Sequence, residues 1–156
     1  MISVRSDLEN LRTRLGPSPL GGIVDGIHHL QYVVGEGQAA ALVAEYATLT
    51  NFRPAGSFRH RATGRRYHVL RLAGAAVGIV VEEQPGPLSG FPPLAGLAFR
   101  CANLAEAERA LAESDVACRR TGMGIVTDPI PGLDDRFAYT DDADYDWFGG
   151  ADFEPL

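Results

Sequence analysis

The sequence contains no lysine, because all 14 of its basic residues are arginine. Schiff-base chemistry that needs a lysine amine is therefore excluded. The net charge of −6 argues against nucleic acid as a partner. Residues 1–80 hold nine Arg against five acids (+4), and residues 81–156 hold five Arg against fifteen acids (−10). This uneven distribution of charge along the chain indicates solvated faces. Alternatively, it indicates an Arg-rich surface at 53–71 that meets the acidic tail or an anionic ligand.

Cysteines and long apolar runs are also scarce. Cys101 and Cys118 are the only cysteines, which is typical of a reduced, cytoplasmic protein with two buried thiols. No apolar run reaches the ~18 residues of a membrane span, and the first residues lead into no apolar signal segment. From 156 residues with a hydrophobic fraction of 46% we expect one globular, cytoplasmic domain without membrane contact.

The order of the predicted elements repeats once along the chain. Each repeat is expected to hold a strand, a helix and further strands, with the helices at 36–49 and 104–113. The expected segments are an N-terminal arm with a short helix (1–25), a first βαβββ module (26–84), a Pro/Gly connector (85–93), a second, abbreviated βαβββ module (94–141) and an acidic aromatic tail (142–156). The sequence therefore predicts an α+β fold, in which two βαβββ modules form a curved mixed sheet of eight strands around a cavity.

The first strand, 27–34, carries polar side chains on a face that should point inward. Strict alternation puts His29 and Gln31 on this inward face and places His28 on the opposite face, under the helix. An imidazole and an amide at inward positions need partners from the protein or from a ligand. We expect an acid of the fourth strand, Glu82 or Glu83, to lie near them.

These observations predict a ligand site in the cavity. Its candidate ligand-binding residues are His29, Gln31, Glu83, Phe99, Arg100 and Tyr139. The polar members would hold the head group of a ligand, and Val33, Ile79 and Phe99 would surround an apolar body, as an aromatic acid or a similar metabolite requires.

The motifs and their order resemble the vicinal oxygen chelate superfamily of glyoxalases, bleomycin-resistance proteins and dioxygenases. The narrower resemblance is to the N-terminal domain of 4-hydroxyphenylpyruvate dioxygenase and 4-hydroxymandelate synthase. It rests on His28–Gly35, Phe52–Pro54, Tyr67–Arg71, Leu97–Arg100 and Tyr145–Pro155. In those dioxygenases the iron ligands lie in a C-terminal domain, so the resemblance implies that this chain is like the half without a metal.

The resemblance also gives a test for a metal in this half. Metal-binding members carry a His near the start of each module's first strand and a Glu on a fourth strand. His29 fills the first place, but Gly96 occupies the equivalent place in the second module. Since a divalent catalytic site needs about three converging ligands, we expect no cofactor. The alternative is a divalent metal such as iron or zinc.

Three functions remain open from the sequence. The favoured one is a metal-free protein that binds a small aromatic or antibiotic-like molecule. The alternatives are a metal-dependent enzyme of the dioxygenase or lyase type, and a non-catalytic partner domain of a split dioxygenase. We also expect a homodimer, because superfamily relatives usually pair and the tail aromatics at 145–153 need cover from the same or a second subunit.

Overall fold

The computed structural model describes residues 21–88, 94–129 and 136–156. Most of the expected N-terminal arm, part of the connector and residues 130–135 of the expected second module lie outside the described residues. The elements are β1 (Val24–Val34), α2 (Ala39–Leu49), β2 (Phe52–His60), β3 (Arg66–Leu72), β4 (Gly78–Glu83), β5 (Leu94–Cys101), α3 (Leu104–Glu113), β6 (Cys118–Thr121), β7 (Gly124–Thr127), β8 (Arg136–Thr140), the 3-10 helix η1 (Asp146–Gly149) and β9 (Phe153–Pro155).

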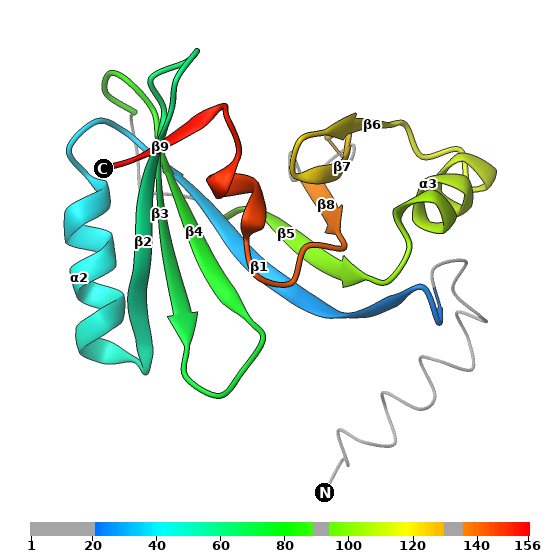
Figure 1. Cartoon of the computed structure of the whole chain (residues 1–156), viewed down its shortest axis with the longest axis horizontal. Coiled ribbons are helices and arrows are strands. Elements are labelled where there is room, and N and C mark those ends of the chain that lie inside the picture. The colour runs from blue at the N-terminus through cyan, green and yellow to red at the C-terminus, as the bar shows by residue number, and fades with distance from the viewer. Residues whose placement is uncertain (1–20, 89–93, 130–135) are drawn as a thin grey trace, which may run out of the picture.

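The nine strands of the described residues form one open mixed sheet in the order β6-β7-β8-β5-β1-β4-β3-β2-β9. The two modules meet where β1 pairs with β5 antiparallel, and within each module the first and last strands are parallel neighbours. The sheet is curved, and the two helices lie outside it at opposite ends (Figure 1). The predicted fold class, two βαβββ modules in a curved mixed sheet, is therefore confirmed.

Helix α2 packs on the outer face of the first module. Its apolar side chains contact a buried cluster of Val34, Leu70, Ile79 and Val81. The helix begins at Ala39, whose N–H donates to the Glu83 carboxylate at 3.2 Å. A carboxylate at this position stabilises the helix by satisfying an N–H of the first turn and by facing the positive end of the helix dipole.

Helix α3 covers the outer face of the second module. Asn103 caps it, because its side-chain oxygen accepts from the N–H groups of Ala105 and Glu106. The cluster beneath the helix contains Cys101, Leu111, Ile125 and Tyr139, with Phe99 packed against it. Strands β6, β7 and β8 have four, four and five residues.

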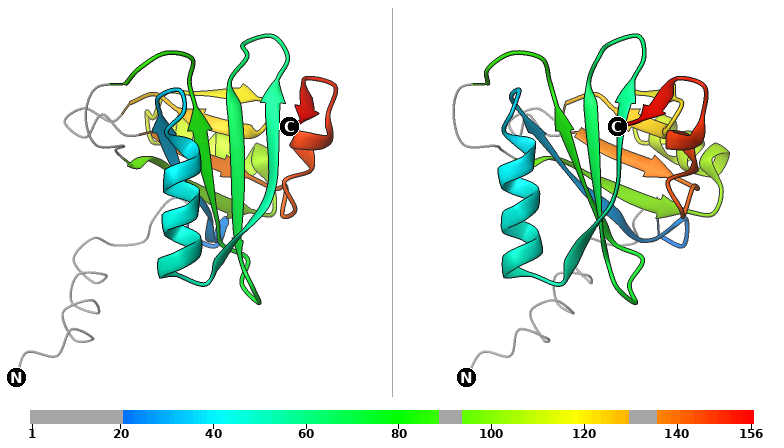
Figure 2. Two further views of the ribbon diagram at one scale, coloured as in Figure 1. Left: turned by 90° about the vertical axis from the view of Figure 1, so that its left-hand side faces the viewer. Right: turned by 60° about the vertical axis from the view of Figure 1, so that its left-hand side comes forward.

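The chain after β8 turns back onto the inner face of the sheet, where it lies between the two modules (Figure 1). It ends in β9, which pairs antiparallel with the edge strand β2 and gives the sheet a ninth strand that the sequence analysis does not predict. A strand of three residues has too little alternation to be recognised. Figure 2 shows this segment on the side of the sheet away from α2.

No helix among the described residues combines the length and the apolar character that crossing a membrane requires.

Candidate binding site on the inner face

A β-bulge at the start of β1 places both histidines on the inner face. The pairing of β1 with β5 shifts register between Ile27 and His29, so one extra residue of β1 is accommodated there. Both His rings consequently lie within about 6 Å of the Tyr145 ring in the C-terminal segment, at centroid distances of 4.5 and 5.9 Å. The expectation that His28 lies under α2 is therefore wrong. Alternation alone could not reveal the bulge.

The two imidazoles form a hydrogen-bonded chain. Nε2 of His28 lies 2.6 Å from the Asp142 carbonyl oxygen, and because a carbonyl only accepts, this nitrogen carries a proton. In the neutral ring Nδ1 of His28 is then the acceptor, and Nδ1 of His29, at 2.7 Å, donates to it. Burial, followed by the neighbouring His28, lowers the pKa of His29 to about 3. Burial is also the main cause that lowers the pKa of His28. Both rings are therefore neutral near pH 7.

Gln31 joins a second buried network on the inner face. Its amide donates to Glu82 at 3.0 Å, and the Gln84 amide donates to the same carboxylate at 3.3 Å. The Arg65 guanidinium pairs with Glu82 at 3.0 Å. Glu82 is only 6% exposed, so these contacts compensate a charge that would otherwise be costly to bury.

The structure separates the other candidate residues from His29 and Gln31. Glu83 lies on the outer face, where it caps α2 and pairs with Arg66 at 3.5 Å. Phe99 and Tyr139 stack on each other beneath α3, also on the outer face. Arg100 is half-buried and pairs with Asp25 at 2.7 Å. Of the two fourth-strand acids left open by the sequence, Glu82 is the one beside Gln31.

The register partners of His29 bear on whether the inner face could hold a divalent metal. His29 is in register with Gly78 on β4 and Ala98 on β5, and neither residue has a side-chain ligand atom. Glu82 lies four residues beyond Gly78, or about 13 Å along the strand. Among the described residues, no group of three or more His, Cys, Asp or Glu side chains is placed to hold an ion.

The C-terminal segment fills the space in front of His29. Tyr145 packs directly over Gly78, where a Cβ would collide with the phenol oxygen, and its hydroxyl donates to the His28 carbonyl at 3.3 Å. Burial raises the pKa of this phenol to about 12, so it stays neutral. Phe148 stacks on Phe58 at 4.7 Å with an angle of 4° between the rings. Protein groups thus provide partners for Nδ1 of His29 and for the amide nitrogen of Gln31.

Ion pairs hold this segment to the Arg-rich first module. Arg59 and Arg61 pair with Glu154 at 3.7 and 3.1 Å, and Arg71 pairs with Asp144 at 3.6 Å. The interpretation in which the arginines at 53–71 meet the acidic tail is therefore correct. Tail aromatics pack on the same chain, so the need to cover them no longer argues for a dimer.

A hollow of about 410 Å³ remains at the mouth of the inner face, between the C-terminal segment, the β2–β3 connection and the β6–β7 turn. We call it the mouth pocket. Its lining is rich in aromatic rings and comprises His60, Thr63, Arg65, Tyr67, Thr121, Gly122, Met123, Trp147, Gly150, Asp152 and Phe153. Its volume lies within the range of small-molecule sites, about 300–1,000 Å³. The sequence analysis missed these residues as a site. The one feature of the sequence that indicated this site was the run of aromatic residues in the tail.

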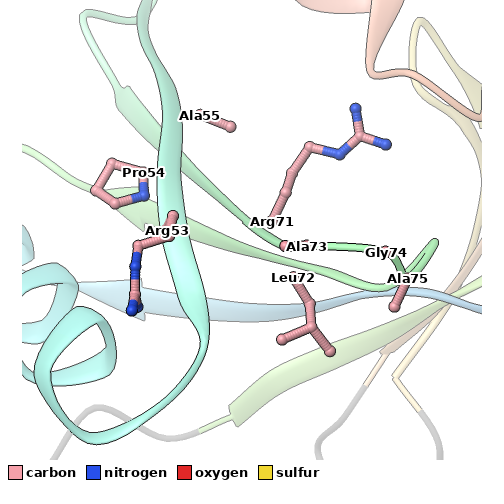
Figure 3. Close-up of a pocket in the computed structure, with 8 residues that line it drawn as sticks. All are labelled: Arg53, Pro54, Ala55, Arg71, Leu72, Ala73, Gly74 and Ala75. Carbon is pink, nitrogen blue, oxygen red and sulfur yellow. The ribbon is translucent and has the colours of Figure 1, made fainter.

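A second hollow, of about 440 Å³, lies beside the β3–β4 turn and has Arg53 and Arg71 at its edges. Figure 3 shows the two guanidinium groups pointing in different directions. Arg53 donates to the carbonyls of Ala47 in α2, Thr50 and Phe52, and Arg71 lies over the Tyr145 ring. The two arginines therefore do not converge on a common anion.

No protein-family profile matches the sequence, and no curated protein matches it either. Solved structures do match. Methylmalonyl-CoA epimerase from Mycobacterium tuberculosis is 18% identical with a TM-score of 0.59, and the match covers 75% of this chain and 87% of the epimerase. A mutant of 4-hydroxymandelate synthase from Streptomyces coelicolor is 18% identical with a TM-score of 0.53, covering 63% of this chain and 32% of the synthase.

A fusion of a xylose isomerase-like TIM barrel with 4-hydroxyphenylpyruvate dioxygenase is also 18% identical, with a TM-score of 0.57, and the match covers 85% of this chain and 21% of the fusion. At these identities the similarity establishes the fold and not the activity. Since epimerase and dioxygenase-type structures both match, the resemblance indicated by the sequence is confirmed at the level of the fold: this chain has the vicinal oxygen chelate fold.

Proposed function

We propose that the protein binds a small aromatic molecule in the mouth pocket and does so without a metal ion. The observation that carries this proposal is the aromatic lining of the pocket, in which Tyr67, Trp147 and Phe153 come from two different parts of the chain. Aromatic rings supply large apolar contacts at fixed orientations, which suits a planar ligand. The absence of side-chain ligand atoms at the register partners of His29 supports independence from a metal.

The chain offers a direct readout, because Trp147 is its only tryptophan and lines the pocket. We expect aromatic compounds to change the intrinsic fluorescence of Trp147 in a saturable way, with the same Kd in the presence of a chelator. A response that needs added iron, zinc or manganese, and that is lost in His29→Ala, would contradict the metal-free proposal and favour a metal-dependent enzyme.

A pair of variants tests whether the mouth pocket is the binding site. Met123→Asp places a charge in the pocket wall, and we expect it to weaken aromatic binding at least about tenfold, because apolar contact is lost and the carboxylate loses hydration. Val116→Asp is the matched control, since Val116 is an exposed apolar residue of the same module outside the pocket. Equal affinities of the two variants would show that binding occurs elsewhere.

Assembly and location stay predictions. With the tail aromatics covered by their own chain, the homodimer is proposed on the superfamily resemblance alone. The cytoplasm is proposed from the scarcity of cysteine.

A further inference from the structure

We propose that the N-terminal segment, residues 1–20, packs as a helix on the outer face of the sheet, over strands β1 and β5. The proposal is independent of ligand binding in the mouth pocket. It concerns the part of the outer face between the two helices. Figure 1 shows α2 and α3 at opposite ends of the sheet, with β1 and β5 between them.

Apolar side chains form a continuous surface across this part of the sheet. Leu30 of β1 is opposite Leu97 of β5, which is in register with Phe137 of β8. Ile27 of β1 is opposite Phe99 of β5, and the rings of Phe99 and Phe137 are 5.7 Å apart. Directly paired residues, and residues two apart in one strand, share a face. Because Phe99 packs beneath α3, all five side chains lie on the outer face. We call them the central outer patch.

The other described residues cover the central outer patch only in part. Ile27 is 41% exposed, and the remaining four side chains are half-buried. Single exposed apolar residues are common on protein surfaces. A contiguous apolar surface in the middle of a sheet is different, because such a face normally packs against another element.

The N-terminal segment has a complementary apolar stripe. Val4, Leu8, Leu11 and Leu15 follow each other at intervals of four, three and four residues, so in a helix they lie on one side. From Leu8 to Leu15 such a stripe covers about 10 Å, since a helix rises about 1.5 Å per residue. Three neighbouring strands also span about 10 Å, which is the width of the patch over β1, β5 and β8.

The connection to β1 keeps this stripe near the patch. Residues 16–20 join Leu15 to Gly21, and Gly21 forms a bridge with Val24 at the start of β1. The five connecting residues span up to about 18 Å, so the stripe can reach Ile27 farther along the same strand. Tethering raises the local concentration of the segment at the patch. The flanking helices also favour a narrow helix over the broad face of a second copy.

Hydrogen–deuterium exchange of the full chain tests the proposal, with a synthetic peptide of residues 1–20 as the reference. We expect the amides of residues 8–15 to exchange at least about tenfold more slowly in the protein than in the peptide, because docking stabilises their helical hydrogen bonds. Equal rates in protein and peptide would overturn the proposal. Protection that appears only at high protein concentration would also overturn it, because a second copy would then cover the patch.

A variant of the patch identifies the surface on which the segment packs. Ile27→Asp places a charge there, and we expect residues 8–15 to lose their protection and the melting temperature to fall by about 3–6 °C. Val116→Asp is the matched control, because Val116 is 36% exposed between α3 and β6, outside the patch. Protection that survives Ile27→Asp would contradict the proposed location.

A variant of the segment removes the same contact without altering the sheet. We expect Leu11→Asp to reproduce the loss of protection, whereas Asn10→Asp, one position off the stripe, retains it. The double variant of Leu11→Asp and Ile27→Asp should melt no lower than the less stable single variant, because both changes remove one shared contact. Additive decreases in melting temperature would show that the two residues do not meet.

Discussion

At the scale of single residues, the pair His28–His29 shows what the sequence can and cannot reveal. The polarity of the first strand correctly indicates an inward face with an imidazole and an amide at His29 and Gln31. The bulge that brings His28 to the same face is set by the pairing with β5, which local alternation does not contain. Likewise, two adjacent glutamates look equivalent in the sequence, and only the register of β4 decides that Glu82 is inside.

The buried histidine pair predicts a particular dependence of stability on pH. A His whose pKa is lowered in the folded state favours the neutral form, so the unfolded chain binds more protons below its ordinary pKa of 6.5. The contribution of the neutral histidines to stability is therefore fully present above pH 6.5. It is lost as the pH decreases toward the folded pKa of His29, about 3. We expect the free energy of unfolding in urea to decrease between pH 6.5 and 5, by up to about 1.4 kcal/mol per pH unit for each such group.

The variant His29→Gln separates this histidine from the carboxyl groups, which titrate mainly at lower pH. We expect the slope between pH 6.5 and 5 to become shallower in the variant. An unchanged slope would mean that His29 is not held neutral by burial.

At the scale of elements, the C-terminal segment has the largest effect on the site. Its aromatic and acidic residues could be recognised in the sequence, as could the arginines at 53–71. Their meeting depends on how the chain turns after β8, so the mouth pocket could not be predicted. The two helices and the longer strands could be predicted, because their patterns are local and repeated.

Packing of this segment can be measured through Phe148, which is 3% exposed. We expect Phe148→Ala to lower the free energy of unfolding by about 3–5 kcal/mol, because a stacked, buried ring is lost. Leu49→Ala is the control, since Leu49 is 73% exposed at the end of α2. Leu49→Ala should lower the free energy of unfolding by less than about 0.5 kcal/mol. If the two variants lost similar stability, the segment would not be packed in the core.

At the scale of the whole molecule, the fold places two modules edge to edge and leaves an inner face that this chain covers with its own tail. The superfamily resemblance predicts a homodimer, which multi-angle light scattering can test. We expect a particle of about twice the chain mass of 16.7 kDa. A single particle of the chain mass at high protein concentration would contradict the dimer, although binding in the mouth pocket does not require it.

The central claim, metal-independent binding of an aromatic molecule beside Trp147, can be tested in one NMR titration. With one tryptophan in the chain, a proton–nitrogen correlation spectrum contains a single indole signal. Benzamide added in the presence of a chelator should shift that signal progressively until it saturates. An indole signal that stays in place at millimolar benzamide, or that moves only after iron or zinc is added, would contradict the account.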